Sequence, residues 1–531
     1  MSEPTSETFS HLIIGAGPAG LQLARQLQEA GRSYAVLEAR DAPGAFFATY
    51  PRHRTLISIN KPHTGTDDPE LNLRMDWNSL LTPDPRLLFT RYTERYFPAA
   101  DDLRRYLADY AAAFDLRIRY NTRVARVERP EPGGDFLVTA EDGSRRTAPV
   151  VVVATGVSMP YIPPIPGIEH AEQYADMPVD PDGFTDQRVL IIGKGNSALE
   201  SADNLVERAA VIHVGGPGSL RMAWQTHYVG HLRAVNNNFL DTYQLKSQNA
   251  ILDGSVLGIE PQPGGGFLVR FSFSRADEVV KELFYDRVLC CTGFRLDAAP
   301  FGEGCRPRLA INDRFAELNP AYESANVPGL YFAGTLMQQR DFKKSTTGFI
   351  HGFRYTVRAL GHILEQREHG VPWPHRTLPR DPEALADAVV ARVNRTSALW
   401  QQFGVLADVL LLPSEGEARY LEEVPVGYLL DGGLAEPDTG LPADDLLAAV
   451  TLEYGPDHDK VDPFDISVRR TAQDRVEEAH DAAYLHPVIR VYRGATMLAE
   501  HHLAENLENH WDSEATHRAP LAAFLEKAVT L

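Results

Sequence analysis

The 531-residue chain is too long for a single hydrophobic core, and at roughly 100–200 residues per domain it should fold as about three domains. Its 72 acidic residues outweigh 52 lysines and arginines, and the formal charge of −20 repels nucleic acids and anionic membrane surfaces. Hydrophobic residues make up 44% of the chain, and no apolar run approaches the ~20 residues that cross a bilayer. Small-molecule chemistry is therefore favoured over nucleic-acid or membrane binding.

The first ten residues, MSEPTSETFS, lack the basic and apolar segments of a signal peptide. Three cysteines are too few for a framework of disulfide bonds. The expected location is therefore the cytoplasm. The oligomeric state is left open, a homo-oligomer included.

A strand, a glycine-rich turn and a helix are predicted near the N-terminus. The apolar run His11–Ile14 is typical of a buried parallel strand, and Gly15-Ala16-Gly17-Pro18-Ala19-Gly20 follows it. Apolar residues then recur with helical spacing as far as Gly31, and the next strand, Tyr34–Leu37, ends on Glu38. A lone GxGxxG pattern is weak evidence, but this whole context indicates a dinucleotide-binding unit.

The residues of this turn have separate physical roles. Gly15 allows the tight turn, Gly17 lets the backbone approach a diphosphate, and Gly20 permits close packing of helix on strand. Pro18-Ala19 begins the helix, whose free N–H groups and partial positive charge suit phosphates. Glu38 stands at the usual spacing for an acid that accepts hydrogen bonds from a ribose.

The same arrangement recurs in the middle of the chain. Residues 189–192 (VLII) lead into Gly193-Lys194-Gly195-Asn196-Ser197-Ala198, for which a nicotinamide nucleotide is the natural ligand. An NAD site usually has an acid after the next strand, but residues 211–214 are followed by Gly215-Gly216, which favours NADPH. Arg221 is the nearest cation for a 2′-phosphate. The alternative is a surface position for Arg221 and a turn that binds nothing.

Further elements follow the same patterns. Helices are predicted over residues 101–114 and 349–364, and buried strands over 150–153, 288–291 and 329–334. The proline-rich stretch 160–166 predicts a crossing between domains, and the strand at 288–291 predicts the return crossing. After residue 374 the chain is still long enough for a separate domain.

Three segments carry a family resemblance. Residues 44–51 (GAFFATYP) look like a glycine-aromatic-Tyr-Pro segment that covers a flavin, and Ser58-Ile59-Asn60-Lys61 resembles a segment whose Asn lies beside the flavin ring. Gly195-Asn196-Ser197 matches the second turn of the same proteins. The chain thus resembles the flavin-containing monooxygenases and their N-hydroxylating relatives. The resemblance implies FAD on the first turn, NADPH or NADH on the second, and O2 as a co-substrate.

Other stretches resemble a narrower group, the FAD-dependent oxidoreductase domain family that includes the ER flavoprotein associated with degradation. They are DWNSLL (76–81), THYVG (226–230), DTYQLKS (241–247), GFIHGFRYTV (348–357), FGVLADV (403–409) and LHPVI (485–489). The resemblance covers nearly the whole chain. No signal sequence or retention signal is recognised in it, so an ER role is not expected.

The expected fold class is α/β, with two Rossmann-like dinucleotide-binding domains, one for FAD and one for NAD(P)H, and a C-terminal α+β domain. The FAD-binding domain is predicted in two parts, 1–165 and 297–372. The NAD(P)H-binding domain is predicted at 166–296 and the C-terminal accessory domain at 373–531.

The resemblance also suggests residues at the flavin. Asn60, followed by Lys61, is expected on the substrate side of the ring, because a non-titrating amide donates a hydrogen bond without supplying protons; an ordinary turn-capping role is the alternative. Thr335 stands where many flavoproteins hold the ribityl chain with an acid. The other predicted FAD contacts are Phe46, Arg54, Thr155, Gly334, Gly348 and Phe349, the last two beginning a helix aimed at the flavin.

Polar and aromatic side chains form the predicted substrate site. Together they indicate a polar substrate, with a carboxylate as one option, although any single one is more often structural. The set comprises Trp77, Asn78, His227, Tyr228, Arg233, Asn236, Tyr243 and Lys246.

No metal site and no redox dithiol are predicted. His501, His502 and Glu505 belong to a run that is typical of a solvent-facing helix. Cys290 and Cys291 are adjacent in a predicted strand, so their side chains point to opposite faces.

The predicted function is an FAD- and NAD(P)H-dependent monooxygenase that uses a flavin C4a-hydroperoxide to hydroxylate a small polar substrate, with an amine nitrogen as the leading target. Two alternatives stay open. One is an NAD(P)H–flavin oxidoreductase that inserts no oxygen, and the other is a flavoprotein that acts mainly by binding a partner protein.

Overall fold

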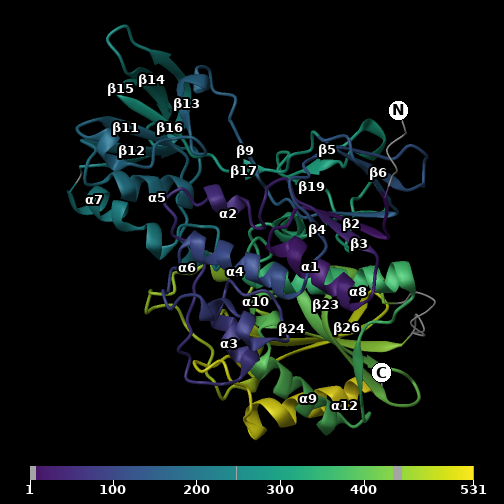
Figure 1. Cartoon of the computed structure of the whole chain (residues 1–531). Coiled ribbons are helices and arrows are strands. Elements are labelled where there is room, and N and C mark those ends of the chain that lie inside the picture. Colours follow the sequence, from purple (N-terminus) through teal and green to yellow (C-terminus); the bar gives the residue numbers. More distant parts are fainter. Residues whose placement is uncertain (1–6, 247, 435–444, 530–531) are drawn as a thin grey trace, which may run out of the picture.

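The computed structural model describes residues 7–246, 248–434 and 445–529. Within this part of the chain, three large sheets organise the molecule: one around each glycine turn and one in the C-terminal tail. Figure 1 shows the second of them in a lobe of its own, at the upper left. None of the described helices combines the length and the apolar character that a membrane span requires.

The first sheet, with its helices, is termed the flavin lobe. Its five parallel strands run in the order β20-β8-β2-β3-β4. Helices α1 and α8 pack together below this sheet, and α4 contacts α1. Because both faces of the sheet are covered, its central strands are apolar along their whole length, and this is why they could be predicted. The bounds are β2 (His11–Ile14), β3 (Tyr34–Leu37), β4 (Ile118–Arg119), β8 (Val150–Val153), β20 (Leu330–Phe332), α1 (Pro18–Glu29), α4 (Ala100–Ala113) and α8 (Ile350–His369).

Smaller elements complete this lobe. A four-stranded sheet in the order β1-β7-β6-β5 lies beside the main one. Its strands are β1 (Glu7–Thr8), β5 (Val124–Glu128), β6 (Phe136–Ala140) and β7 (Arg145–Ala148), and the short helices are α2 (Phe46–Thr49) and α3 (Pro69–Met75).

The second sheet, termed the coenzyme lobe, has seven strands in the order β10-β16-β11-β12-β13-β14-β15. The strands as far as β13 are parallel, and β14 and β15 extend the sheet antiparallel. The chain enters and leaves the lobe through β9 (Met159–Pro160) and β17 (Phe294–Arg295), which pair with each other. The other bounds are β10 (Glu172–Gln173), β11 (Arg188–Ile192), β12 (Val211–Gly216), β13 (Ala250–Pro261), β14 (Phe267–Phe273), β15 (Val279–Tyr285), β16 (Arg287–Cys290), α5 (Asn196–Leu205), α6 (Ala223–Thr226) and α7 (Asn238–Lys246).

The tail folds as an α+β domain, as predicted. Its six antiparallel strands run in the order β21-β23-β22-β24-β25-β26, with α8 against one face and α9 and α12 packed together on the other. The prediction of a helix at His501 and His502 was wrong: they end β26, where backbone pairing with β25 takes up their hydrogen bonds. The bounds are β21 (His375–Leu378), β22 (Leu406–Leu412), β23 (Ala418–Pro425), β24 (Leu446–Glu453), β25 (His486–Arg493), β26 (Thr496–His502), α9 (Pro382–Arg395), α10 (Ala398–Gln401), α11 (Val426–Leu430) and α12 (Ala519–Val529).

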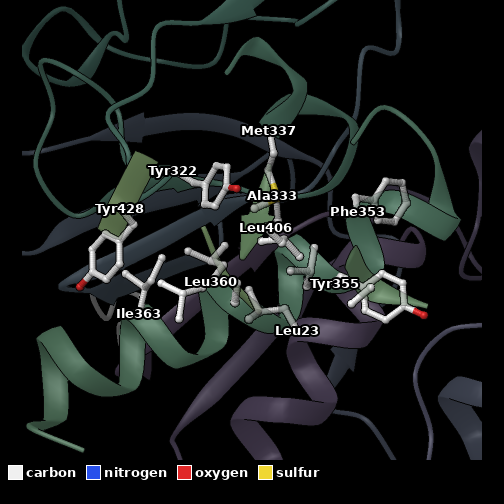
Figure 2. Close-up of a cluster of buried hydrophobic side chains, with 14 of the residues drawn as sticks. Leu23, Tyr322, Ala333, Met337, Phe353, Tyr355, Leu360, Ile363, Leu406 and Tyr428 are labelled. Atoms are coloured by element: carbon white, nitrogen blue, oxygen red, sulfur yellow. The ribbon is translucent and has the colours of Figure 1, made fainter. Parts of the chain in front are cut away.

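The tail domain and the flavin lobe share one hydrophobic core, whereas the coenzyme lobe has clusters of its own. Figure 2 shows Leu23 of α1, Leu360 and Ile363 of α8, Leu406 of β22 and Tyr428 of α11 in a single cluster. Core side chains that fill one continuous space stabilise each other, so these two parts of the chain should unfold together.

Leu360 lies fully buried in this shared core. Leu360→Ala should lower the free energy of unfolding by about 2–5 kcal/mol, because it removes apolar contacts and leaves a cavity. Hydrogen–deuterium exchange should then accelerate in both β2 and β22. Leu257→Ala, at a position 37% exposed in the coenzyme lobe, is the control and should have a much smaller effect. Faster exchange in β2 with no change in β22 would show that the tail folds independently.

Candidate active site

The first glycine turn joins β2 to α1 with almost no space between the segments. Gly15 has a φ of +105°, and a Cβ there would lie 2.9 Å from the carbonyl oxygen of Ala154. A Cβ on Gly20 would lie 2.0 Å from the carbonyl oxygen of Gly15. Only glycine fits at these positions. Gly17 caps α1 without a side-chain hydrogen bond, so the first N–H groups of the helix are open to a ligand.

Glu38 holds the turn from the end of β3. Its Oε2 accepts a hydrogen bond from the Ala16 N–H at 2.8 Å, and its Oε1 accepts one from the Arg40 N–H at 2.9 Å. Each carboxylate oxygen has further lone-pair capacity, so Glu38 can also accept from a ribose hydroxyl.

Two cavities meet over this turn. The outer cavity, of about 460 Å³, is lined by Glu38 and Arg40, and the inner cavity, of about 420 Å³, extends towards the coenzyme lobe. Gly17, Phe46 and Thr155 line both. These linings suit an extended dinucleotide: its adenosine would lie in the outer cavity near Glu38, its diphosphate at Gly17 and a flavin ring in the inner cavity.

Most of the predicted FAD contacts line these cavities. Two of them, Gly20 and Arg54, line neither cavity. Gly20 lies in α1 beneath the turn. Arg54 donates to the Phe47 carbonyl at 2.8 Å and to the Asp101 carboxylate at 2.7 Å. The residues that line one or both cavities are Gly15, Gly17, Pro18, Ala19, Glu38, Phe46, Thr155, Gly334, Thr335, Gly348 and Phe349.

Helix α8 begins at the wall of the inner cavity. Phe349 caps it without a side-chain hydrogen bond, and Ile350 follows in the lining. Thr335 fixes this end by donating to the Gly348 carbonyl at 3.1 Å. The open N–H groups and the positive end of the helix dipole can stabilise a flavin carbonyl oxygen.

The second glycine turn repeats the geometry of the first. Gly193 has a φ of +125°, and Gly195 caps α5 without a side-chain hydrogen bond. The Asn196 amide has a structural role, because its Oδ1 accepts from the Arg233 N–H at 3.0 Å and so holds that loop against the turn. Asn196 and Ser197 also line the inner cavity, which therefore reaches both turns.

Arg221 is exposed and lines neither cavity. The last residue of β12 is Gly216, and its register partner on β13 is Asp253. Asp253 forms ion pairs with Lys194 of the glycine turn and with Arg275, whose Nε lies 2.9 Å from its Oδ2. The acid missing from the end of β12 is thus supplied by the neighbouring strand, and two cations offset its charge.

Asn60 and Lys61 lie outside both cavities. The Asn60 amide is buried and donates to the carbonyls of Thr93 at 2.7 Å and Arg95 at 3.3 Å, while Lys61 is exposed. The structure therefore gives Asn60 an anchoring position in place of the predicted one beside the flavin. Ser58, in the same segment, is the residue that lines the inner cavity.

Two of the predicted substrate residues line the inner cavity, and two more contact residues of its lining. Trp77 and Asn236 line it directly. Arg233 lies over the Trp77 ring, with 5.1 Å from its Cζ to the ring centroid. Tyr228, whose pKa is raised to about 12 by burial, donates its hydroxyl to the lining residue Gln338 at 3.1 Å.

The other predicted substrate residues do not line this cavity. Asn78 is fully buried and bonds the segment around Ser58. His227 stacks on Tyr454 of the tail domain at 4.1 Å, and Tyr243 lies on α7. The side chain of Lys246 lies outside the described residues.

The sequence analysis missed a buried acid in the lining, Glu200. It accepts a hydrogen bond from the Tyr174 hydroxyl, and both residues line the inner cavity. Burial raises the pKa of Glu200 to about 7. Glu200 follows Asn196 by one helical turn on α5, so the i, i+4 spacing was the signal that could have found it.

The chain is similar in sequence to known flavoproteins. Residues 12–334 match the family model "Pyridine nucleotide-disulphide oxidoreductase". FAD-dependent oxidoreductase domain-containing protein 2 is 39% identical in Mus musculus and 35% in Danio rerio, over 98% of this chain and 84% of each relative. Flavin-containing monooxygenase FMO GS-OX-like 9 of Arabidopsis thaliana is 29% identical over 60% of this chain and 68% of its own length.

Solved structures share the fold. The flavin-containing monooxygenase from Stenotrophomonas maltophilia has a TM-score of 0.52 at 20% identity, and the alignment covers 67% of this chain and 97% of that one. The bacillithiol disulfide reductase from Staphylococcus aureus also has a TM-score of 0.52, at 18% identity, with 68% and 99% covered.

Fold and site together define a flavoprotein with two dinucleotide-binding lobes. The chain belongs to the pyridine nucleotide-disulphide oxidoreductase family. It is a flavin-dependent oxidoreductase, and the predicted cofactors, FAD and a nicotinamide coenzyme, are confirmed at the level of this family.

Glu200→Gln should make stability less sensitive to pH. The pKa of Glu200 is about 7 in the folded chain and about 4.5 for an unperturbed glutamate, so its ionisation costs free energy on folding once the pH exceeds the lower value. The penalty grows as the pH rises to 7 and then stays constant. The variant should therefore melt at a similar temperature to the parent at pH 4.5 and at a higher one at pH 8.

Glu207→Gln, an exposed acid just beyond α5, is the matched control and should show no such trend. A difference in melting temperature between Glu200→Gln and the parent that is the same at pH 4.5 and pH 8 would contradict the assignment.

Proposed function

We propose that the chain is an FAD- and NADPH-dependent monooxygenase that oxygenates a small polar substrate, with an amine nitrogen as the leading target. The observation that carries the proposal is the inner cavity, which reaches both glycine turns and has a mostly apolar and aromatic wall. Such a wall keeps water away from the reacting centre. The similarity to the Arabidopsis flavin-containing monooxygenase supports the same activity. Bound FAD supplies the transfer of electrons from the coenzyme to O2.

The residues of the chain have separate roles in this reaction. The start of α1 and Glu38 would hold the FAD diphosphate and ribose, and the start of α8 would hold a flavin carbonyl oxygen. The start of α5, with Ser197 in the lining of the same cavity, would hold the nicotinamide coenzyme. Tyr174 keeps its proton on the hydroxyl, because burial raises its pKa, and donates it in a hydrogen bond to Glu200.

NADPH is the preferred coenzyme in this proposal. A 2′-phosphate beside Gly216 would meet no uncompensated acid, because Asp253 is paired with Lys194 and Arg275. The stem of Lys194 packs against Gly216, and its Nζ donates to the Gly218 carbonyl and pairs with Asp253, so it offsets the acid beside the 2′-phosphate position.

Thiol chemistry is not supported by the site. All three cysteines of the sequence are buried and none lines either cavity. Burial raises the pKa of Cys290, Cys291 and Cys305, which disfavours the reactive thiolate. The alternatives are a flavin reductase that inserts no oxygen and a flavoprotein that mainly binds a partner.

The test is to follow oxygen with the FAD-loaded protein. NADPH should bleach the flavin without air, faster than NADH does. In air, a panel of small amines should include one that gains a single oxygen atom by mass spectrometry and lowers the hydrogen peroxide released per NADPH. Hydrogen peroxide in full yield with every amine would favour the reductase. A flavin that neither coenzyme bleaches would favour the binding protein.

A further inference from the structure

Arg233 is a partly buried cation that has no counter-ion among the residues the structure describes. One of its terminal nitrogens, Nη1, is buried without a hydrogen-bond partner, and within the described residues its guanidinium forms no ion pair. Burial lowers its pKa, and the only group that raises it is Tyr96, which is not a carboxylate. Burying a charge without a partner is costly, so such an arginine is best explained by an anion that the protein binds.

The position of Arg233 links it to the inner cavity. Its backbone N–H is fixed by Asn196, and Asn236, three residues later, lines the cavity. Its guanidinium lies over Trp77, a lining residue from the flavin lobe. The planar guanidinium therefore sits where the two lobes face each other, next to the wall of the proposed substrate site.

Among the described residues, no carboxylate acts on Arg233. The Trp77 ring also stacks on His351, at 4.1 Å between ring centroids. His351 is fully buried, and burial lowers its pKa well below the usual range, so it stays neutral and adds no charge beside Arg233. Next along α8, Arg354 is bound to backbone carbonyls.

We infer that Arg233 binds the carboxylate of the substrate, so that the substrate class is an amine that also carries a carboxylate group. An arginine can hold a carboxylate through two parallel hydrogen bonds, and Trp77 orients its plane. A carboxylate fixed at the edge of the cavity leaves the rest of the substrate to extend along the apolar wall towards the flavin. This inference rests on the proposed function, because it names the substrate class of that reaction.

The diphosphate of the coenzyme is the other source of an anion for this arginine. We favour the substrate, because Arg233 packs on Trp77 of the flavin lobe, whereas the coenzyme diphosphate belongs at the start of α5. Binding measurements separate the two sources.

The test uses the FAD-loaded, oxidised protein and three probes of similar length: 6-aminohexanoate, hexanoate and hexylamine. Changes in the flavin absorbance and in tryptophan fluorescence report binding without turnover. Both carboxylates should bind. Hexylamine, which lacks the carboxylate, should bind at least about tenfold more weakly. Arg233→Met should weaken carboxylate binding by about 10- to 100-fold, and Arg233→Lys should retain part of the affinity.

NADP+ binding should change less than about twofold in Arg233→Met. Arg208→Met, at an exposed arginine of the coenzyme lobe, is the control and should leave all affinities unchanged. Each variant must keep its FAD content, which shows that it is folded.

The inference is overturned if the parent protein binds neither carboxylate, or if Arg233→Met loses NADP+ and not carboxylate affinity. A different result would separate the two proposals. If carboxylate binding depends on Arg233 but no amine is oxygenated, the proposed function is contradicted and the carboxylate site at Arg233 is confirmed.

Discussion

The site depends on the close approach of three backbone segments at the first glycine turn. The carbonyl of Ala154, at the end of β8, lies against Gly15, and the carbonyl of Gly15 in turn lies against Gly20 on α1. Glu38 adds a link from β3 through its bond to the Ala16 N–H. These contacts aim the open end of α1 at the junction of the two cavities. Any side chain at Gly15 or Gly20 would push the segments apart and move the helix off the diphosphate position.

Two buried arginines fix the segment that carries Trp77, one within the flavin lobe and one through bonds to the tail domain. Arg354 of α8 donates to the carbonyls of Leu73, Asp76 and Ser79 and so fixes the segment that carries Trp77. Arg74, in the same segment, donates across the shared core to backbone carbonyls at 393–396 of the tail. Because these bonds tie the Trp77 segment to α8 and to the tail, they fix the position of the substrate-side wall. The tail thus contributes to the active site without lining either cavity.

Elements with strong local signals could be predicted from the sequence. β2, β8 and β20 are short apolar runs, since the sheet is covered on both faces, and the turns after β2 and β11 need glycine for steric reasons. The order of strands in the tail could not be predicted, because antiparallel pairing joins residues far apart in the chain.

The side-chain roles were harder to predict. Asn60 has the residue type expected at the flavin, yet pairing with Asp76 and the carbonyls of the segment at 93–95 turn its amide inward. The partners of Glu200 and Arg233 come from other segments, Tyr174 and Trp77, which local patterns do not connect.

The most direct test of the account compares FAD and FMN binding to the protein stripped of flavin. FMN carries the same ring and one phosphate, but it lacks the adenosine that would fill the outer cavity and bond Glu38. Titration followed by flavin fluorescence should show FMN binding at least about 100-fold more weakly than FAD, roughly 3 kcal/mol. Equal affinity for the two flavins would mean that the turn at Gly15–Gly20 and Glu38 does not hold the dinucleotide, and would contradict the account.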